Sequence, residues 1–482
     1  MYHHLTALCM LVRGICTLLS ILIVWYSELY AQSLTPDSLS FEQFLRRVVA
    51  ANPLLQSADL EQNVARAEQQ SALGSFDPVL RGVYSLKEEL GKDKINTLDA
   101  DVELPLNALF GPKLNTGFRR SIGESSNPEL RTALGGQINL GLSVPLWQGV
   151  LTDRRRTNLE KANLRPLLAN IVQTQEQNNI LRAAGLQYWS WSEAFEQVRI
   201  AQAVFDISLL RSNFIAARAR RGEVAPLDSI EALQEIERRR GDVFRAQRAF
   251  EQAGIDLAVF LWLGNGSTTN FIPRQLTEVP RSMPLSVPFV DSLRVQAERT
   301  AALMLRPEMQ RIDFSQQNLQ LDLNLAYEFQ KPFIETKAEW YYPLGSEMAL
   351  NNYKVGLNVA VPVFFRTANA QVELFNIGLD RINLQRAQVS RLVQAEVDNA
   401  FNALQRAADR IRAADREVFY AIQMEEGERR RFTAGETSLL VVNLRERAAA
   451  EARVRLVNAR ADYFRAYTQY YWAVGKIGEF VR

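Results

Sequence analysis

The chain repeats itself over a long period. Pro53 and Pro78 recur 254 positions later as Pro307 and Pro332, with the same spacing of 25 residues. Further identities at this offset are Gln56 with Gln310, Asp59 with Asp313, Gln62 with Gln316, and Ala72 with Ala326. A duplication of this period constrains the fold more than any local motif, because one unit of about 200 residues must fold twice.

The two ends of the chain and the joint between the copies set the expected domains. Arg13 precedes an apolar run from Ile15 to Trp25, which has the length of a signal-peptide core and is too short to cross a bilayer. Small Ala31 suits cleavage before the first repeat; an uncleaved anchor is the alternative. We expect a signal peptide at 1–31, a first repeat at 32–263, a proline-rich linker at 264–290 and a second repeat at 291–482.

Cleavage of this leader has a chemical consequence. Every cysteine and histidine of the chain lies in it: His3, His4, Cys9 and Cys16. The remaining chain can form neither a disulfide, a Cys/His zinc site, nor a histidine-activated nucleophile. We therefore expect no catalytic residue, no metal, no cofactor and no enzyme activity. The net charge of +2 gives no argument for nucleic acid binding.

Several stretches alternate strictly between apolar and polar residues. The clearest are Leu98 to Leu106, Ile138 to Leu146 and Tyr353 to Val363. Such a strand has one apolar and one polar face. Both a β-sandwich and a membrane barrel contain strands of this kind, so the alternation alone does not decide between them.

The helical stretches are very long. There is no proline from Leu167 to Ala225, or after Pro362. Apolar residues between Val372 and Leu404 recur at the three-, four- and seven-residue steps of a coiled-coil seam. A helix from Asn369 to Arg431 would be about 90 Å long, which favours an extended coiled coil over an ordinary globular bundle.

Matching turns end these helices. Gly222-Glu223 recurs as Gly435-Glu436, and glycine suits the left-handed residue after a helix. Pro226 suits the first turn of the helix that follows, while Thr437 or Ser438 can cap its counterpart. The arginines before the two glycines interact favourably with the helix dipole, because basic side chains are stabilising in a last helical turn. Contact with a partner protein is the alternative role of these arginines.

With these landmarks in order, nearly all of the mature chain resembles the TolC family of outer-membrane efflux proteins. The resemblance is carried by Ala51-Asn52-Pro53, Phe76-Asp77-Pro78, Ser143-Val144-Pro145-Leu146-Trp147, Phe432 to Leu440, and Leu456 to Tyr463. It implies a mixed α/β membrane protein, in which a trimeric outer-membrane β-barrel continues as a long periplasmic α-helical coiled-coil barrel, with two structural repeats per chain.

The resemblance also implies a function and partners. The chain would be the passive exit duct of a tripartite efflux or type I secretion system, in the outer membrane and extending into the periplasm. It would form a homotrimer in outer-membrane lipid and work with a periplasmic adaptor and an inner-membrane transporter. The implied adaptor contacts are Arg220, Arg221, Gly222, Glu223, Gly435, Glu436, Thr437 and Ser438.

Two departures from the family are visible. Pro78 to Pro145 spans 67 residues, against 30 in the second copy. The surplus of 37 contains strand-like Asp99 to Leu106 and Lys113 to Ser121, joined near Phe110-Gly111-Pro112. We expect an inserted hairpin, which either adds strands to the barrel or folds elsewhere.

The second departure concerns acids at the helix tips. Family members often carry acids six and nine residues after the second tip glycine, where this chain has Val441 and Leu444. Asp228 and Glu231 occupy the equivalent positions of the first copy. We expect these four residues to line the periplasmic aperture; solvated acids at a helix start are the alternative.

Two other classes of function are alternatives to an exit duct. A periplasmic coiled-coil structural protein without a pore would fractionate as a soluble protein. An enzyme that uses carboxylates alone has no paired-acid motif to support it.

The aromatic residues from Tyr463 to Trp472 are interpreted as helix packing, because Tyr463, Tyr467 and Tyr470 share one helix face.

Overall fold

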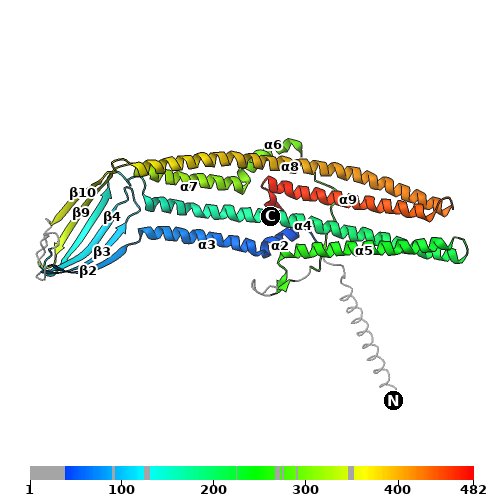
Figure 1. The fold of residues 1–482 in the computed structure, drawn as a ribbon, viewed down its shortest axis with the longest axis horizontal. Helices are drawn as coiled ribbons and strands as arrows, with labels where there is room; N and C mark the ends of the chain where they lie inside the picture. The colour runs from blue at the N-terminus through cyan, green and yellow to red at the C-terminus, as the bar shows by residue number, and fades with distance from the viewer. Residues whose placement is uncertain are drawn as a thin grey trace, which may run out of the picture.

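The structure is a computed structural model that describes residues 38–89, 93–123, 131–223, 225–265, 272–273, 276–288, 291–345 and 352–482. The expected signal peptide at 1–31 lies outside the described residues. The molecule is elongated, with a β-sheet at one end and two helical hairpins at the other (Figure 1). The middle of its length holds the C-terminus and the short helix α2.

The two halves of the chain share one plan, in which two helices, a set of strands and two longer helices follow one another, and the first half has two more strands than the second. The first half contains α2 (Phe41–Ala51), α3 (Pro53–Leu73), η1 (Gly74–Phe76), β2 (Val79–Glu89), β3 (Asp93–Pro105), β4 (Lys113–Ile122), β5 (Gln137–Pro145), α4 (Arg154–Arg220) and α5 (Pro226–Leu261). The second contains α6 (Ser292–Leu305), α7 (Pro307–Phe329), β9 (Phe333–Pro343), β10 (Tyr353–Ala360), α8 (Arg366–Thr433), α9 (Leu439–Ala473) and η3 (Ile477–Val481).

The repeated prolines mark equivalent helix starts. Pro53 and Pro307 stand in the first turns of α3 and α7, where the missing N–H costs nothing. The side chain of Asn52 accepts a hydrogen bond of 3.0 Å from the N–H of Leu54. The segment from Phe41 to Leu73 therefore forms two helices rather than one, because proline disfavours helical backbone at the preceding residue.

Two long helices set the length of the molecule. Helices α4 and α8 have 67 and 68 residues, or about 100 Å each. Helices α3 and α5 follow one another along α4, and α7 and α9 follow one another along α8 (Figure 1). No helix within the described residues is both long and apolar enough to cross a bilayer.

The expected coiled-coil seam is present. The buried residues of α8 recur at alternating steps of four and three: Val393, Val397, Ala400, Leu404, Ala407, Ile411 and Ala414. This spacing is that of knobs-into-holes packing.

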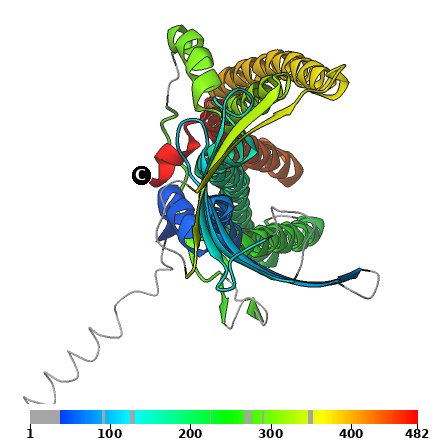
Figure 2. The same ribbon diagram turned by 90° about the vertical axis from the view of Figure 1, so that its left-hand side faces the viewer.

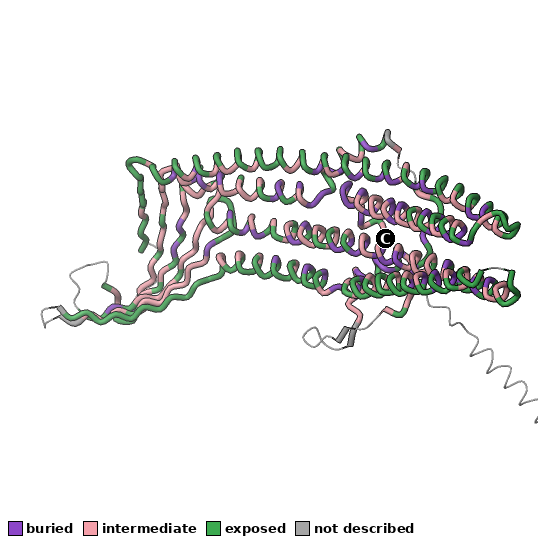
Figure 3. The backbone as a smooth tube through the Cα atoms, turned by 45° about the vertical axis from the view of Figure 1, so that its right-hand side comes forward, coloured by how far each residue is buried: buried purple, intermediate pink, exposed green. Residues whose placement is uncertain are grey.

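The largest core lies midway along the helices, where buried residues gather (Figure 3). The Trp189 and Phe464 rings stack with centroids 4.4 Å apart. The ring of Trp472 lies between the guanidinium groups of Arg182 and Arg306, at 4.2 and 4.1 Å. Since Tyr463 is also buried here, the aromatic residues of α9 serve packing, as expected.

The described part of the linker contains three short strands. Its strand β8 (Val279–Pro280) pairs in parallel with β1 (Ser38–Leu39), and β6 (Gly264–Asn265) pairs with β7 (Ile272–Pro273). The β1–β8 pair lies against the central core, because the hydroxyl of Tyr188 donates to the carbonyl of Leu39 at 2.8 Å. The linker thus fastens the start of the first repeat.

The six main strands form one antiparallel sheet in the order β10-β9-β5-β4-β3-β2. The sheet is curved, and its β2–β3 edge extends well beyond the helices (Figure 2). Four strands come from the first repeat and two from the second. The inserted hairpin of the first repeat is therefore β3 and β4, which lie between β5 and the edge strand β2.

Candidate functional site

The sheet presents two chemically different faces. In an antiparallel sheet, directly opposed residues share a face. One row crosses all six strands: Leu80, Val102, Thr116, Leu140, Trp340 and Tyr353. The next row is Leu104, Leu114, Leu142, Ala338 and Val355. Large apolar side chains of this face, such as Leu80 and Tyr353, are exposed.

The opposite face is polar over the same strands. Its rows include Arg81, Asp101, Gly117, Asn139 and Tyr341, and then Glu103, Asn115, Gly141, Glu339 and Lys354. Its charges pair across strands: Arg119 of β4 lies 2.5 Å from Asp99 of β3. A sheet with one exposed apolar face and one polar face has the arrangement of a wall between lipid and an aqueous lumen.

At the far end of the molecule, the turn between α4 and α5 is a Schellman motif. The N–H of Gly222 donates to the carbonyl of Ala219, and that of Glu223 to the carbonyl of Arg218, both at 3.0 Å. Gly222 has φ 76°, which glycine adopts without strain. Glu223 also lies 2.7 Å from Arg221 and 3.1 Å from Arg218. The hydrogen bond from Arg221 lowers the pKa of Glu223 below its ordinary value, against an opposing effect of desolvation.

The turn between α8 and α9 repeats this geometry. Gly435 has φ 79°, and its N–H donates to Phe432 at 3.1 Å. The N–H of Glu436 donates to Arg431 at 2.9 Å, and the two side chains lie 3.7 Å apart. Ser438 stands at the N-cap of α9, as expected, but its side chain makes no capping hydrogen bond.

The structure brings the candidate tip residues to one end of the molecule (Figure 1). All eight expected adaptor contacts lie on these two turns, and seven are exposed: Arg220, Arg221, Gly222, Glu223, Gly435, Glu436 and Ser438. Thr437 is half-buried. The two tips form one accessible surface at the end of the hairpins.

The four candidate aperture residues stand in different surroundings. Glu231 of α5 is half-buried and accepts a hydrogen bond of 3.1 Å from the side-chain amide of Asn443 on α9. No described residue bonds to the carboxylate of Asp228, one turn nearer the tip. Leu444 is exposed and Val441 is half-buried. Glu231 thus joins the two repeats at their tips.

Sequence reasoning missed a group of buried charges behind the tips, which we call the charged seam: Arg211, Glu235, Arg239, Glu425, Glu428 and Glu446. All are buried or nearly so, with Glu446 only 5% exposed. Glu425 and Glu428 continue the heptad of α8, three heptads beyond Leu404 and Ala407. The heptad positions of α8, extended beyond its apolar seam residues, fall on these two acids, so the repeat itself is the signal that locates them.

Ion pairs connect three helices through the charged seam. Glu446 of α9 pairs with Arg211 of α4 and, at 3.1 Å, with Arg429 of α8. Glu425 lies 3.2 Å from Arg429 and 3.6 Å from Arg453. Burial raises the pKa of Glu425 above its ordinary value, despite the lowering effect of both arginines.

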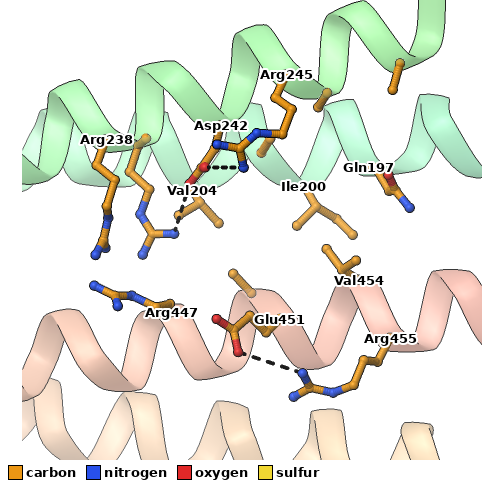
Figure 4. Close-up of a pocket in the computed structure, with 15 residues that line it drawn as sticks. Gln197, Ile200, Val204, Arg238, Asp242, Arg245, Arg447, Glu451, Val454 and Arg455 are labelled. Carbon is orange, nitrogen blue, oxygen red and sulfur yellow. Dashed lines mark hydrogen bonds and ion pairs between the residues drawn. The ribbon is translucent and has the colours of Figure 1, made fainter.

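A groove of about 640 Å³ runs between α5 and α9, with α4 as its floor (Figure 4). Five arginines line it against two acids: Arg238, Arg239, Arg245, Arg447 and Arg455 against Asp242 and Glu451. Asp242 pairs with Arg245 at 3.1 Å and Glu451 with Arg455 at 3.8 Å. Arginines therefore outnumber acids in the lining, although Arg238 and Arg239 also pair with Glu235, and Arg455 pairs with Glu417. No cluster of three or more metal-ligating side chains occurs within the described residues.

Comparison with known proteins agrees with this architecture. Residues 295–476 match the family model of the outer membrane efflux protein. No curated protein sequence gives a significant match.

Solved outer-membrane channels share the fold over most of its length. The open-state Neisseria gonorrhoeae MtrE outer membrane channel is 15% identical, with 90% of this chain and 88% of that chain covered and a TM-score of 0.63. The Campylobacter jejuni CmeC outer membrane channel is 13% identical, with 90% and 85% covered and a TM-score of 0.61. The Vibrio cholerae outer membrane protein VceC is 12% identical, with 90% and 96% covered and a TM-score of 0.61.

The family match lies in the second repeat, and the shared fold extends over both repeats. The second repeat therefore matches the outer membrane efflux protein family, and 90% of the chain shares the fold of the solved outer-membrane channels.

Proposed function

We propose that this protein is the outer-membrane exit duct of a tripartite efflux or type I secretion system. The observation that carries the proposal is the two-faced sheet, whose strands lead directly into helices of about 100 Å. An apolar outer face suits lipid, a polar inner face suits an aqueous lumen, and the helices are long enough to cross much of a periplasm. Transport through such a duct is passive, and an inner-membrane transporter supplies the energy.

The working form is a homotrimer. The sheet of one chain has two open edges, and unpaired backbone groups at such an edge are very costly in lipid. Cyclic assembly removes both edges with one repeated interface. The sheet would then lie in the outer membrane, with the helices and their tips in the periplasm.

The exposed turns around Gly222 and Gly435 are the proposed docking surface for a periplasmic adaptor. Their matching Schellman geometry gives the trimer six similar tips, two from each chain. Asp228, Glu231, Val441 and Leu444 are the proposed lining of the aperture between these tips. The arginine-rich groove of Figure 4 lies behind these tips, between α5 and α9, and its surplus of arginines favours an acidic partner surface.

Cell fractionation combined with single-channel recording tests the duct. We expect the protein in the outer-membrane fraction as a heat-resistant trimer that opens ion-conducting pores in planar bilayers. A boiled, monomeric sample is the matched control and should give no pores. Recovery as a monomer from the soluble periplasmic fraction, without pore activity, would instead support a coiled-coil structural protein.

A further inference from the structure

The two surplus strands of the first repeat are integral to the sheet. Strand β3 pairs with β4 from Asn96–Ile122 to Pro105–Lys113, and β4 pairs with β5 from Lys113–Ser143 to Arg119–Gln137. The register has no break on either side of the hairpin. A hairpin that folded elsewhere would leave β2 beside β5, whereas here β3 and β4 separate them.

The surplus strands also continue both faces of the sheet. Val102 of β3 and Thr116 of β4 fill the apolar row between Leu80 and Leu140. On the polar face, Asn115 of β4 donates to the hydroxyl of Ser143 of β5 at 3.3 Å. Alternation matched to the neighbouring strands is what a wall strand requires, because a slip of one residue would reverse the faces.

The turn between β3 and β4 lies at the helical end of the sheet. The N–H of Leu106 donates to the carbonyl of Pro112 at 2.9 Å, which closes the turn. Gly111 of this turn and Asp153, the N-cap of α4, line one pocket of about 360 Å³. The added strands therefore reach the helical end of the sheet, where a turn joins β3 to β4 and neither strand leads directly into a helix.

One chain cannot close this sheet on itself. Strands β2 and β10 are its two edges, and five strand spacings of about 4.8 Å separate them by roughly 24 Å. Strand β2 leads away from the helices and β10 leads back into α8. The β2 edge of one copy therefore meets the β10 edge of the next in the antiparallel sense of the rest of the sheet.

We propose that β2 of each copy pairs with β10 of its neighbour, so that three copies form an 18-stranded barrel with β3 and β4 in its wall. The proposal rests on the trimeric duct proposed above and specifies its interface. Without β3 and β4, each chain would supply four strands and the barrel would have twelve. Since barrel diameter grows roughly linearly with strand number, the lumen would be about half as wide again.

Cysteine cross-linking tests the interface, because the chain has no cysteine after Cys16. One cysteine replaces Leu80, Gly82 or Tyr84 of β2, and a second replaces Leu357 of β10. All lie on the apolar face. A disulfide needs Cα atoms within about 7 Å, so a β2–β10 bond must join two copies. The matched control places the first cysteine at Phe118 of β4, which would be the edge strand if β2 and β3 lay outside the wall.

We expect covalent dimers and trimers from at least one β2–β10 pair and none from the β4–β10 pair. Cross-linking of β4 to β10, without any β2–β10 product, would overturn the 18-stranded barrel and leave the trimeric duct intact. Absence of heat-resistant trimers in the unmodified protein would instead refute the proposed function.

Single-cysteine variants give a second test that does not depend on cross-linking. In liposomes, a water-soluble maleimide should react at Asn115→Cys, on the polar face of β4, at least tenfold faster than at Thr116→Cys, on the apolar face. Equal rapid labelling of the two positions would place the hairpin outside the wall and overturn the proposal.

Discussion

The carboxylate of Glu446 on α9 pairs with the guanidinium group of Arg211 on α4, and this buried contact joins the two repeats behind their tips. Glu446 is 5% exposed and Arg211 is 13% exposed at the side chain. Arg429 approaches the same carboxylate from α8 at 3.1 Å. One acid thus connects three helices.

Replacement of this acid by its amide should loosen the tips. Glu446→Gln leaves Arg211 without its counter-charge, and an uncompensated buried charge costs about 3 kcal/mol. The free energy of local opening, measured by hydrogen exchange along α9, should therefore fall by about 3 kcal/mol. The matched control is Glu451→Gln, an exposed acid on the same helix, which should change exchange little. Equal effects of both variants would contradict a special role for Glu446.

The charged seam should also respond to pH. Burial raises the pKa of Glu425, so the folded tip binds this proton more tightly than the unfolded chain does. The stabilisation from protonation is therefore fully present below the unfolded pKa and is lost as pH rises through the raised pKa. Hydrogen exchange of the α8 tip should slow, after correction for intrinsic rates, as pH falls from 7 to 5. Glu425→Gln should flatten this dependence, and an unchanged pH profile in that variant would refute the assignment.

The helices and strand faces could be predicted because their signals are local. The heptad of α8 and the alternation in β10 are both properties of consecutive residues. The buried charges were not predicted, because Glu425 and Glu428 are polar residues at seam positions that normally hold apolar ones. Their partners come from other helices, so only the folded structure shows that they are paired.

The role of the inserted hairpin illustrates the same limit. The alternation of residues predicts its two strands. It does not predict whether those strands pair within the barrel or fold elsewhere. Strand order depends on contacts between distant segments, such as Leu140 beside Trp340. The tip contact between Glu231 and Asn443 likewise joins residues 212 positions apart, which no local pattern encodes.

Two glycines of α8 and its turn should respond to alanine in opposite directions. An added Cβ meets no atom within 4 Å at Gly427 or Gly435, so conformation alone decides the effect. Gly435 has φ 79°, where alanine costs about 1 kcal/mol. Gly427 lies within the helix, where alanine gains about 1 kcal/mol. Exchange rates at the α8 tip should therefore rise for Gly435→Ala and fall for Gly427→Ala; the same direction in both would contradict the left-handed conformation of the turn.

The tip acids provide the remaining prediction, which concerns conduction. Three copies would place three Asp228 and three Glu231 carboxylates around one aperture. A ring of acids concentrates cations and binds divalent cations. Replacement by amides removes the charge and keeps the size, and the amide oxygen introduced by Glu231→Gln can still accept the hydrogen bond from Asn443.

The double variant Asp228→Asn with Glu231→Gln should therefore conduct with weaker cation preference and weaker block by divalent cations. Planar-bilayer recordings under a KCl gradient measure the first effect as a reversal potential nearer zero, and Mg²⁺ titration measures the second. Glu237→Gln is the matched control, because Glu237 is an exposed acid of α5 that pairs with Arg240 at 2.7 Å, farther from the tip. The control should behave like the unmodified protein. If the double variant also keeps its reversal potential and Mg²⁺ sensitivity, Asp228 and Glu231 do not line the aperture and serve only the start of α5.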